Sequence, residues 1–184
     1  MLPNQARLKY TYDSYHNVKT AVSGEDVKDA FTYDTYGNNT SVKVVDPANS
    51  SAPAIEANAE YTGNGNYLSS VTDGNRGTVS YGYDVQTGLL GWVKGLGDNS
   101  FNKVIYSYNN LQQLTGVSKY LEENDGVANG RTSTVSYTYI EDNLNTSTHD
   151  GITGMSTTYT FSYAAFNALS EVKAGGRGRS PMTT

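Results

Sequence analysis

Large and small side chains alternate along several short stretches of this chain. Residues 79–84, 104–109 and 135–139 place Val and Tyr at every second position, mostly with Ser, Thr or Gly between them, and residues 9–13, 31–34 and 159–163 follow the same pattern. A period of two predicts β-strands with one face of large side chains. No stretch keeps apolar residues at helical spacing over the length of a helix, so an all-β fold is expected.

The alternating stretches share two aromatic residues separated by one position. These pairs are Tyr10/Tyr12, Phe31/Tyr33, Tyr81/Tyr83, Tyr106/Tyr108, Tyr137/Tyr139 and Phe161/Tyr163, and Tyr61 heads a seventh unit that lacks its first aromatic. The second aromatics of successive units are 21, 28, 22, 25, 31 and 24 residues apart. Self-similarity at such a period indicates a repeat architecture, in which no unit carries a site alone.

Turn-forming residues follow the aromatic pairs. Asp13, Asp34 and Asp84 come directly after the second aromatic, and Gly37 and Gly88 follow within four further residues. An Asp side chain bonds the backbone two residues on, and glycine tolerates positive φ. Each unit is therefore predicted to be a β-hairpin with a loop of four or five residues.

An aliphatic residue follows six positions after the second aromatic in four units. These steps run from Tyr12 to Val18, Tyr83 to Leu89, Tyr108 to Leu114 and Tyr163 to Leu169, and Tyr61 reaches Tyr67 by the same step. A further anchor comes three residues later, at Ala21, Trp92, Val117 and Val172. A step of three breaks the alternation, so a β-bulge in the return strand is predicted. Trp92 occupies a slot that holds valine elsewhere and is expected to pack in the core.

Together these patterns predict one domain, an array of six or seven antiparallel β-hairpins. Residues 1–7 are expected to form a leader, residues 8–173 the repeats, and residues 174–184 an irregular tail in which the pattern stops abruptly. The Pro-bounded stretch 47–53 and the acidic stretch 122–126 are predicted loops within the array. A single hairpin is marginal in water, so neighbouring units must support one another.

Composition excludes several classes of function. The net charge of -5 and pI of 4.9 argue against a nucleic-acid backbone or an anionic membrane as partner. The absence of Cys removes disulfides, thiol catalysis and Cys-ligated metals. No apolar run of transmembrane length occurs, so membrane insertion is not expected, and the first residues do not form a signal peptide.

These repeats resemble the RHS/YD-repeat family, whose unit reads Tyr-x-Tyr-Asp-x-x-Gly-Arg-Leu-x-x-Val. The matching segments are 10–13, 31–38, 81–84 with Gly88 and Leu89, and 106–109 with Leu114 to Val117. The chain departs from this pattern because the Arg after Gly is missing from every unit, and the family's Asp-Pro-x-Gly-Arg cleavage signature is absent. Residues near the place of that Arg are Asn38, Leu89, Gln113 and Ala168.

The resemblance implies that the hairpins wind into a twisted, spiralling sheet that closes as a hollow shell. In bacterial members the shell encapsulates a C-terminal toxin, and in teneurins it belongs to an adhesion receptor. The resemblance therefore implies a structural segment of an exported protein, secreted or associated with the cell wall. Its partners would be the remainder of the same polypeptide and a toxin cargo. We expect the chain to be an internal piece of that longer protein.

Candidate chemistry outside the repeats is sparse. His149 and Asp150 are interpreted as part of a solvated loop rather than a metal site, since the chain has only two His. The run 141–145 lacks the Gly and the distal Glu of a calcium loop. No catalytic motif occurs, and nothing singles out two of the 18 acids as a glycosidase pair. We predict no enzymatic activity, no cofactor and no metal; a sugar-active enzyme built on stacked strands is a distant alternative.

The Tyr-rich face supports a second interpretation. Exposed aromatic ladders can stack on sugar rings, so a carbohydrate-binding or adhesion module is the alternative to a structural wall. Aromatic residues in every unit favour the structural role, because a binding site would need only a few units. Two unpaired sheet edges and an uncovered aromatic face would also make an isolated piece self-associate.

Overall fold

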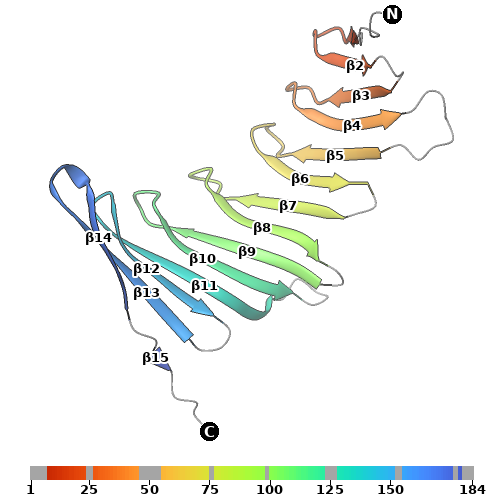
Figure 1. Cartoon of the computed structure of the whole chain (residues 1–184). Helices are drawn as coiled ribbons and strands as arrows, with labels where there is room; N and C mark the ends of the chain where they lie inside the picture. Colours follow the sequence, from red (N-terminus) through yellow and green to blue (C-terminus); the bar gives the residue numbers. More distant parts are fainter. Residues whose placement is uncertain are drawn as a thin grey trace, which may run out of the picture. The chain divides into compact units, whose positions relative to one another are not determined.

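The computed structural model describes residues 8–23, 27–45, 55–74, 77–97, 100–122, 128–151, 155–175 and 178–179. The chain divides into two compact units, Met1–Ser80 and Tyr81–Thr184. In the described residues, β-strands make up all of the regular structure except one 3-10 turn (Figure 1). No helix in this part of the chain is long and apolar enough to span a bilayer. The prediction of an all-β array of antiparallel hairpins is confirmed.

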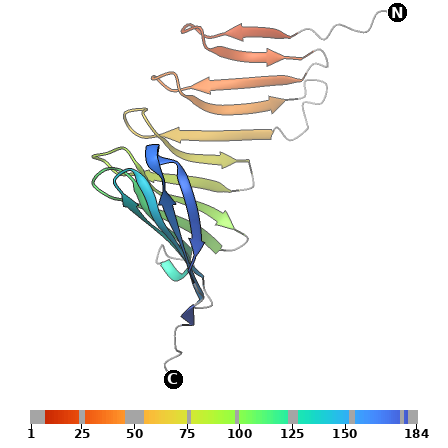
Figure 2. The same ribbon diagram turned by 60° about the vertical axis from the view of Figure 1, so that its left-hand side comes forward.

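The first unit is a sheet of antiparallel strands in chain order. Each strand pairs with the strand that follows it in sequence. Figure 2 shows that the hairpin turns of this unit lie on the same side, at one end of the strands. The unit boundary lies within β7 (Thr78–Tyr83), whose first residues pair with β6. The other strands are β1 (Lys9–Tyr12), β2 (Val18–Val22), β3 (Lys28–Tyr33), β4 (Asn39–Val45), β5 (Ile55–Tyr61) and β6 (Leu68–Asp73).

The second unit repeats this arrangement with longer strands. Consecutive strands again pair antiparallel from the end of β7 to β14, and β15 pairs with β13. Its elements are β8 (Leu90–Gly97), β9 (Ser100–Tyr108), β10 (Leu114–Glu122), β11 (Ala128–Ile140), β12 (Asn143–Gly151), β13 (Met155–Tyr163), η1 (Ala165–Asn167), β14 (Leu169–Ala174) and β15 (Gly178–Arg179).

The alternation of side chains gives each hairpin two different faces. The first aromatic of a pair lies opposite a small or aliphatic residue, as Phe31 does with Val42 and Tyr106 with Val117. We call this side the aromatic face. The residue between the aromatics points to the other side, the polar face, where hydroxyl groups bond across the strands. These bonds join Thr11 to Thr20 at 2.6 Å, Thr32 to Thr40 at 3.0 Å and Thr138 to Thr146 at 2.7 Å.

A bulge in the return strand recurs from hairpin to hairpin. In β1–β2, Thr11 lies opposite Thr20 and Tyr12 opposite Val18, so Lys19 has no partner of its own. The same single extra residue occurs at Thr40, Ser69, Thr115, Asn145 and Ser170. The predicted bulge is confirmed. It returns the aliphatic residue to the aromatic face, which explains the step of three in the sequence.

The sheets are one layer thick. Among the residues whose side-chain burial the structure describes, no hydrophobic residue is buried and Ser147 is the one buried polar residue. A lone layer leaves both faces open to solvent, so these residues form no core of the kind that two packed layers enclose. The predicted leader 1–7 and loop 47–53 lie outside the described residues, as do 123–127 of the second predicted loop. In the predicted tail, Ala174 ends β14 and Gly178–Arg179 form β15.

Candidate functional site

The repeated feature that joins one hairpin to the next is the hydroxyl of the second tyrosine. Tyr33 donates a hydrogen bond to the Val18 carbonyl at 2.9 Å. The same bond runs from Tyr108 to Leu90 at 3.0 Å, from Tyr139 to Leu114 at 2.8 Å and from Tyr163 to Leu144 at 2.9 Å. Each acceptor belongs to the return strand of the preceding hairpin. The hydroxyl of one hairpin therefore bonds the backbone of the hairpin before it.

The register between hairpins is constant where this bond occurs. The residue two positions after the acceptor always lies opposite the residue three positions before the donor tyrosine. The pairs are Thr20 with Ala30, Trp92 with Ile105, Gly116 with Ser136, and Thr146 with Thr160. A one-residue slip would move every side chain to the other face. The tyrosine hydroxyl bond therefore accompanies one specific register between neighbouring hairpins.

An aspartate or asparagine side chain organises the turn in the regular hairpins. Asp34 Oδ1 accepts the backbone N–H groups of Tyr36 and Asn38, both at 2.9 Å, and Asp34 Oδ2 accepts the Asn38 Nδ2 group at 3.0 Å. Asp13 makes the corresponding bonds with Tyr15 and Asn17. Asn109 replaces the carboxylate with an amide, accepting from the backbone of Leu111 and Gln113 and donating to Gln113 Oε1 at 2.7 Å.

These hydrogen bonds shift the pKa of the turn carboxyl groups. Desolvation raises the pKa of Asp34, but the side-chain and backbone bonds from Asn38 and the backbone bond from Tyr36 lower it more, so the net pKa lies below its ordinary value. Asp13 behaves in the same way through Asn17 and Tyr15. The bonds from Thr87 and Gln86 lower the pKa of Asp84. Each carboxylate is thus held ionised as a turn acceptor.

The turns also require one residue with positive φ. Gly37 has φ of 85° and Gly65 of 71°, which glycine adopts at no steric cost. His16 and Gln112 hold the equivalent position with φ of 70° and 63° despite their side chains. In the turn after Tyr83 the positive-φ residue is Gly88, one position later.

Amide side chains join successive turns, which the sequence alone did not indicate. Asn38 Nδ2 donates to the Gly65 carbonyl at 2.8 Å, and Gln113 Nε2 donates to the Glu141 carbonyl at 3.0 Å. Both side chains stand near the place where the YD pattern has Arg. At that place these two units carry a neutral donor that reaches the next turn.

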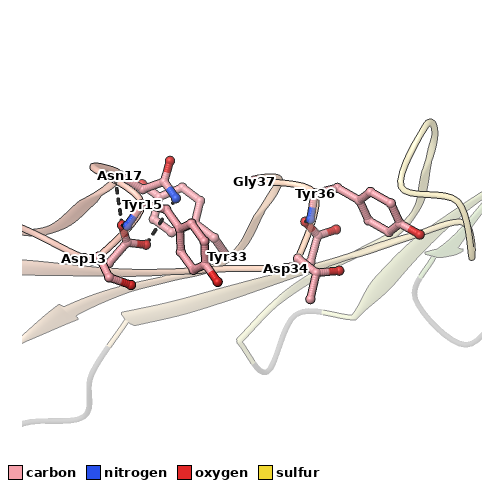
Figure 3. Close-up of a pocket in the computed structure, with 9 residues that line it drawn as sticks. Asp13, Tyr15, Asn17, Tyr33, Asp34, Tyr36 and Gly37 are labelled. Atoms are coloured by element: carbon pink, nitrogen blue, oxygen red, sulfur yellow. Dashed lines mark hydrogen bonds between the residues drawn. The ribbon is translucent and has the colours of Figure 1, made fainter.

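A cavity opens between the first two turns. It has a volume of about 550 Å³ and is lined by Asp13, Ser14, Tyr15, Asn17, Tyr33, Asp34, Thr35, Tyr36 and Gly37. Figure 3 shows the Tyr36 ring extending away from Asp34, and its hydroxyl donates to the Gly63 carbonyl at 3.3 Å. Tyr15 and Tyr36 remain 84% and 64% exposed. The cavity offers ring faces and carboxylate oxygens to a polar ligand.

Two units contradict the predicted six-residue step. Leu68, not Tyr67, lies opposite Tyr61, and β8 begins at Leu90, not Leu89. Both turns contain one more residue, because Thr62 N–H bonds the Tyr67 carbonyl and Asp84 N–H bonds the Leu89 carbonyl. In the turns after Tyr12, Tyr33, Tyr108 and Tyr163 the closing bond spans four positions, as from Asp34 to Asn38.

The longer turn also moves Trp92 to a different face. Trp92 lies opposite Ile105, and Val93 opposite Val104 takes the slot predicted for the indole. On the polar face the indole covers Gly82, where a Cβ would collide with the ring. Lys103 Nζ lies 5.2 Å from the ring centroid. The prediction of a core position for Trp92 is wrong, because the extra turn residue reverses its side.

The remaining predicted sites are strand or turn residues. His149 and Asp150 lie in β12, not in a loop; His149 Nε2 is 2.9 Å from Ser147 Oγ, and its ring meets Tyr159 edge-on at 5.7 Å between centroids. Glu141 and Asp142 form the turn between β11 and β12. Among the described residues no group of three or more His, Asp or Glu is arranged to hold a metal ion.

The structure places the predicted repeat residues at the ends of first strands, in the turns and at the starts of return strands. The aromatic pairs end the first strand of their hairpins, and Asp13, Asp34, Asp84, Gly37 and Gly88 lie in the turns. Leu114 and Leu169 begin return strands opposite Tyr108 and Tyr163. Desolvation, followed by the neighbouring Tyr106, raises the pKa of Tyr108, so its hydroxyl remains a protonated donor at neutral pH.

Comparison with known proteins finds similarity in structure only. No family model matches the sequence, and no curated protein matches it. The crystal structure of TcdB2-TccC3-Cdc42 superposes with a TM-score of 0.71 at 15% identity, covering 92% of this chain and 9% of that one. TcdB2-TccC3-TEV gives 0.70 at 14%, and TcdB2-TccC3 without its hypervariable C-terminal region gives 0.69 at 15%, with the same coverage. The fold is therefore like that of a YD shell, and the chain spans about a tenth of the solved chains it matches.

Proposed function

We propose that this chain is a wall segment of an RHS/YD-type β-shell in an exported protein. The observation that carries the proposal is the junction between hairpins, where one tyrosine hydroxyl and one register recur four times. Such a junction serves to extend a sheet evenly, which is what a wall requires. The likeness in fold to TcdB2-TccC3 over 92% of the chain supports the same role.

We further propose that the parent shell encloses a toxin cargo and is secreted or associated with the cell wall. A one-layer sheet exposes large apolar side chains that a neighbouring layer or cargo would cover, among them Ile55, Leu169 and Val172 at 68%, 57% and 49% exposure. We propose no enzymatic activity for the segment, because the polar groups that recur in its hairpins, the tyrosine hydroxyls and the turn Asp and Asn side chains, are engaged in hydrogen bonds of the sheet and its turns.

Proteolysis of the longest natural product that contains this chain tests the shell proposal. We expect a protease-resistant β-rich core that retains a second segment, and we expect that segment to become cleavable only after the core is opened with denaturant. Equal cleavage of all segments in the native state would contradict enclosure.

A second candidate function, carbohydrate binding, is favoured by the cavity between the first two turns. Tyr15 and Tyr36 present exposed rings beside Asp13 and Asp34, the combination of apolar surface and polar acceptors that sugars use. A glycan array tests this proposal. Binding that is lost in Tyr15→Ala and kept in Tyr10→Ala would support it, whereas no binding to any glycan would exclude it.

A further inference from the structure

The two outermost described strands, β1 and β14, present halves of the junction that joins the hairpins within each unit. Among the described strands β1 pairs only with β2, and β14 only with β13. Tyr12 is a second tyrosine whose hydroxyl has no hydrogen bond to another described residue. Leu169 lies opposite Tyr163, as Val18 lies opposite Tyr12, so it holds the acceptor position of a junction. The β1 edge thus offers the donor hydroxyl of Tyr12, and the β14 edge offers the acceptor carbonyl of Leu169.

The constant register predicts which residues would meet if these edges paired. Two positions after the acceptor Leu169 is Glu171, and three positions before the donor Tyr12 is Lys9. One step further, the established junctions pair Ala21 with Asp29, Val117 with Val135 and Ser147 with Tyr159. The same step pairs Val172 with Leu8.

The residues brought together in this way are chemically complementary. Glu171 and Lys9 carry opposite charges, and opposite charges directly across antiparallel strands are favourable. Glu171 Oε2 also lies 2.8 Å from Lys173 Nζ on its own strand, so Lys9 would join an existing ion pair. Glu171 and Lys9 both point to the polar face, since Glu171 lies opposite Ser162 and Lys9 alternates with Tyr10. Val172 and Leu8 are apolar and exposed by 49% and 61%, and Tyr12 and Leu169 by 59% and 57%. A shift by one residue would bring none of these pairs together.

We propose that, where no flanking hairpin of a longer polypeptide occupies these edges, the β14 edge of this 184-residue chain binds the β1 edge of a second copy, head to tail, in the register of the internal junctions. Tyr12 of one copy donates its hydroxyl to the Leu169 carbonyl of the other, Lys9 faces Glu171, and Leu8 packs on Val172. The contact is heterologous, so each added copy presents a fresh edge of the same kind. The mass in solution therefore rises with concentration without stopping at a dimer.

Disulfide trapping tests the register, because the natural chain contains no Cys. Leu8→Cys and Val172→Cys are made in separate chains and mixed under mild oxidation. Directly opposed residues on antiparallel strands lie within the reach of a disulfide, so we expect covalent heterodimers. Leu8→Cys mixed with Val85→Cys is the matched control, since Val85 is 97% exposed and lies in a turn. Heterodimer yields equal to the control would overturn the proposal.

Charge exchange gives an independent test. Lys9→Glu and Glu171→Lys each place like charges across the contact, and we expect each to weaken association about tenfold in sedimentation equilibrium. An equimolar mixture of the two variants restores opposite charges at both contacts and should recover association. Failure of the mixture to exceed either variant alone would contradict the proposed pairing.

Removal of the donor hydroxyl of Tyr12 provides a third test of the contact between copies. Tyr12→Phe should weaken association about fivefold, whereas Tyr10→Phe, which alters the first aromatic of the same strand, should leave it unchanged. Circular dichroism of each variant confirms that the strands persist. A wild-type chain whose mass is that of a monomer at every concentration would overturn the proposal outright.

Discussion

The turn after Tyr33 and the turn after Tyr163 have the same length but different chemistry. Both close with a backbone bond across four positions, from Asp34 to Asn38 at 3.0 Å and from Ala164 to Ala168 at 2.8 Å. Asp34 adds three bonds from its carboxylate, and Gly37 alone takes positive φ. The second turn has no side-chain acceptor at Ala164.

The second turn consequently adopts a more strained path. Phe166 and Asn167 both take positive φ, at 61° and 58°, and the Phe166 ring is fully exposed. The junction is nevertheless the same, because Tyr163 bonds Leu144 as Tyr33 bonds Val18. The tyrosine hydroxyl and the register therefore define the repeat, while the Asp–Gly turn lowers the strain of the hairpin loop.

The largest effect is expected from adding a side chain to the regular turn. Gly37→Ala places a Cβ at φ of 85° and should lower the free energy of unfolding by about 1–2 kcal/mol. Gly63→Ala is a matched control, because neither glycine has a neighbour near the added Cβ and Gly63 lacks positive φ. Urea unfolding measures both. Equal losses in the two variants would show that the backbone conformation is not the cause.

Relief of strain in the irregular turn should have a smaller effect. Phe166→Gly removes the penalty of a side chain at φ of 61°, so we expect a gain of about 0.5–1 kcal/mol in unfolding free energy. Phe166→Ala removes the same exposed ring but keeps the Cβ, and it should give no gain. A gain in both variants would point to the ring instead of the backbone.

Restoring the missing acceptor should make the turn after Tyr163 more like the turn after Tyr33. Ala164→Asp supplies a carboxylate at the position of Asp34 and should stabilise the chain by about 0.5 kcal/mol through bonds to the backbone of the turn. Amide hydrogen exchange at residues 166 and 168 should slow. Ala168→Asp adds the same charge at the other end of the turn and serves as the control; equal slowing there would contradict a specific acceptor.

The smallest effect concerns acid stability. The folded pKa of Asp34 is depressed by its hydrogen bonds, although desolvation opposes them. The stability it contributes is therefore present above the unfolded pKa and is lost as pH falls through the folded value, below about pH 4. Asp34→Asn should flatten the dependence of the urea midpoint on pH in that range, and Asn109→Asp should steepen it. Unchanged pH profiles in both variants would contradict the assignment.

Sequence pattern predicts much of this fold, because strand alternation and turn chemistry are local. The aromatic pairs, the hairpins and the bulge all follow from residues close in sequence. The face of Trp92, the partner of Tyr61 and the start of β8 did not follow, because one extra turn residue reverses alternation beyond it. The tyrosine-to-carbonyl junction and the Asn38 bond to the next turn were also missed, since they join residues 15 to 27 positions apart.

A series of Tyr→Phe variants tests the junction most directly. Tyr33→Phe, Tyr108→Phe, Tyr139→Phe and Tyr163→Phe each remove one hydroxyl bond between hairpins and should each lower the unfolding free energy by about 1 kcal/mol. Tyr106→Phe and Tyr137→Phe alter first aromatics, which make no such junction, and should change it little. Uniform losses among the second tyrosines alone would establish the repeated junction. Equal losses at first and second positions would contradict it.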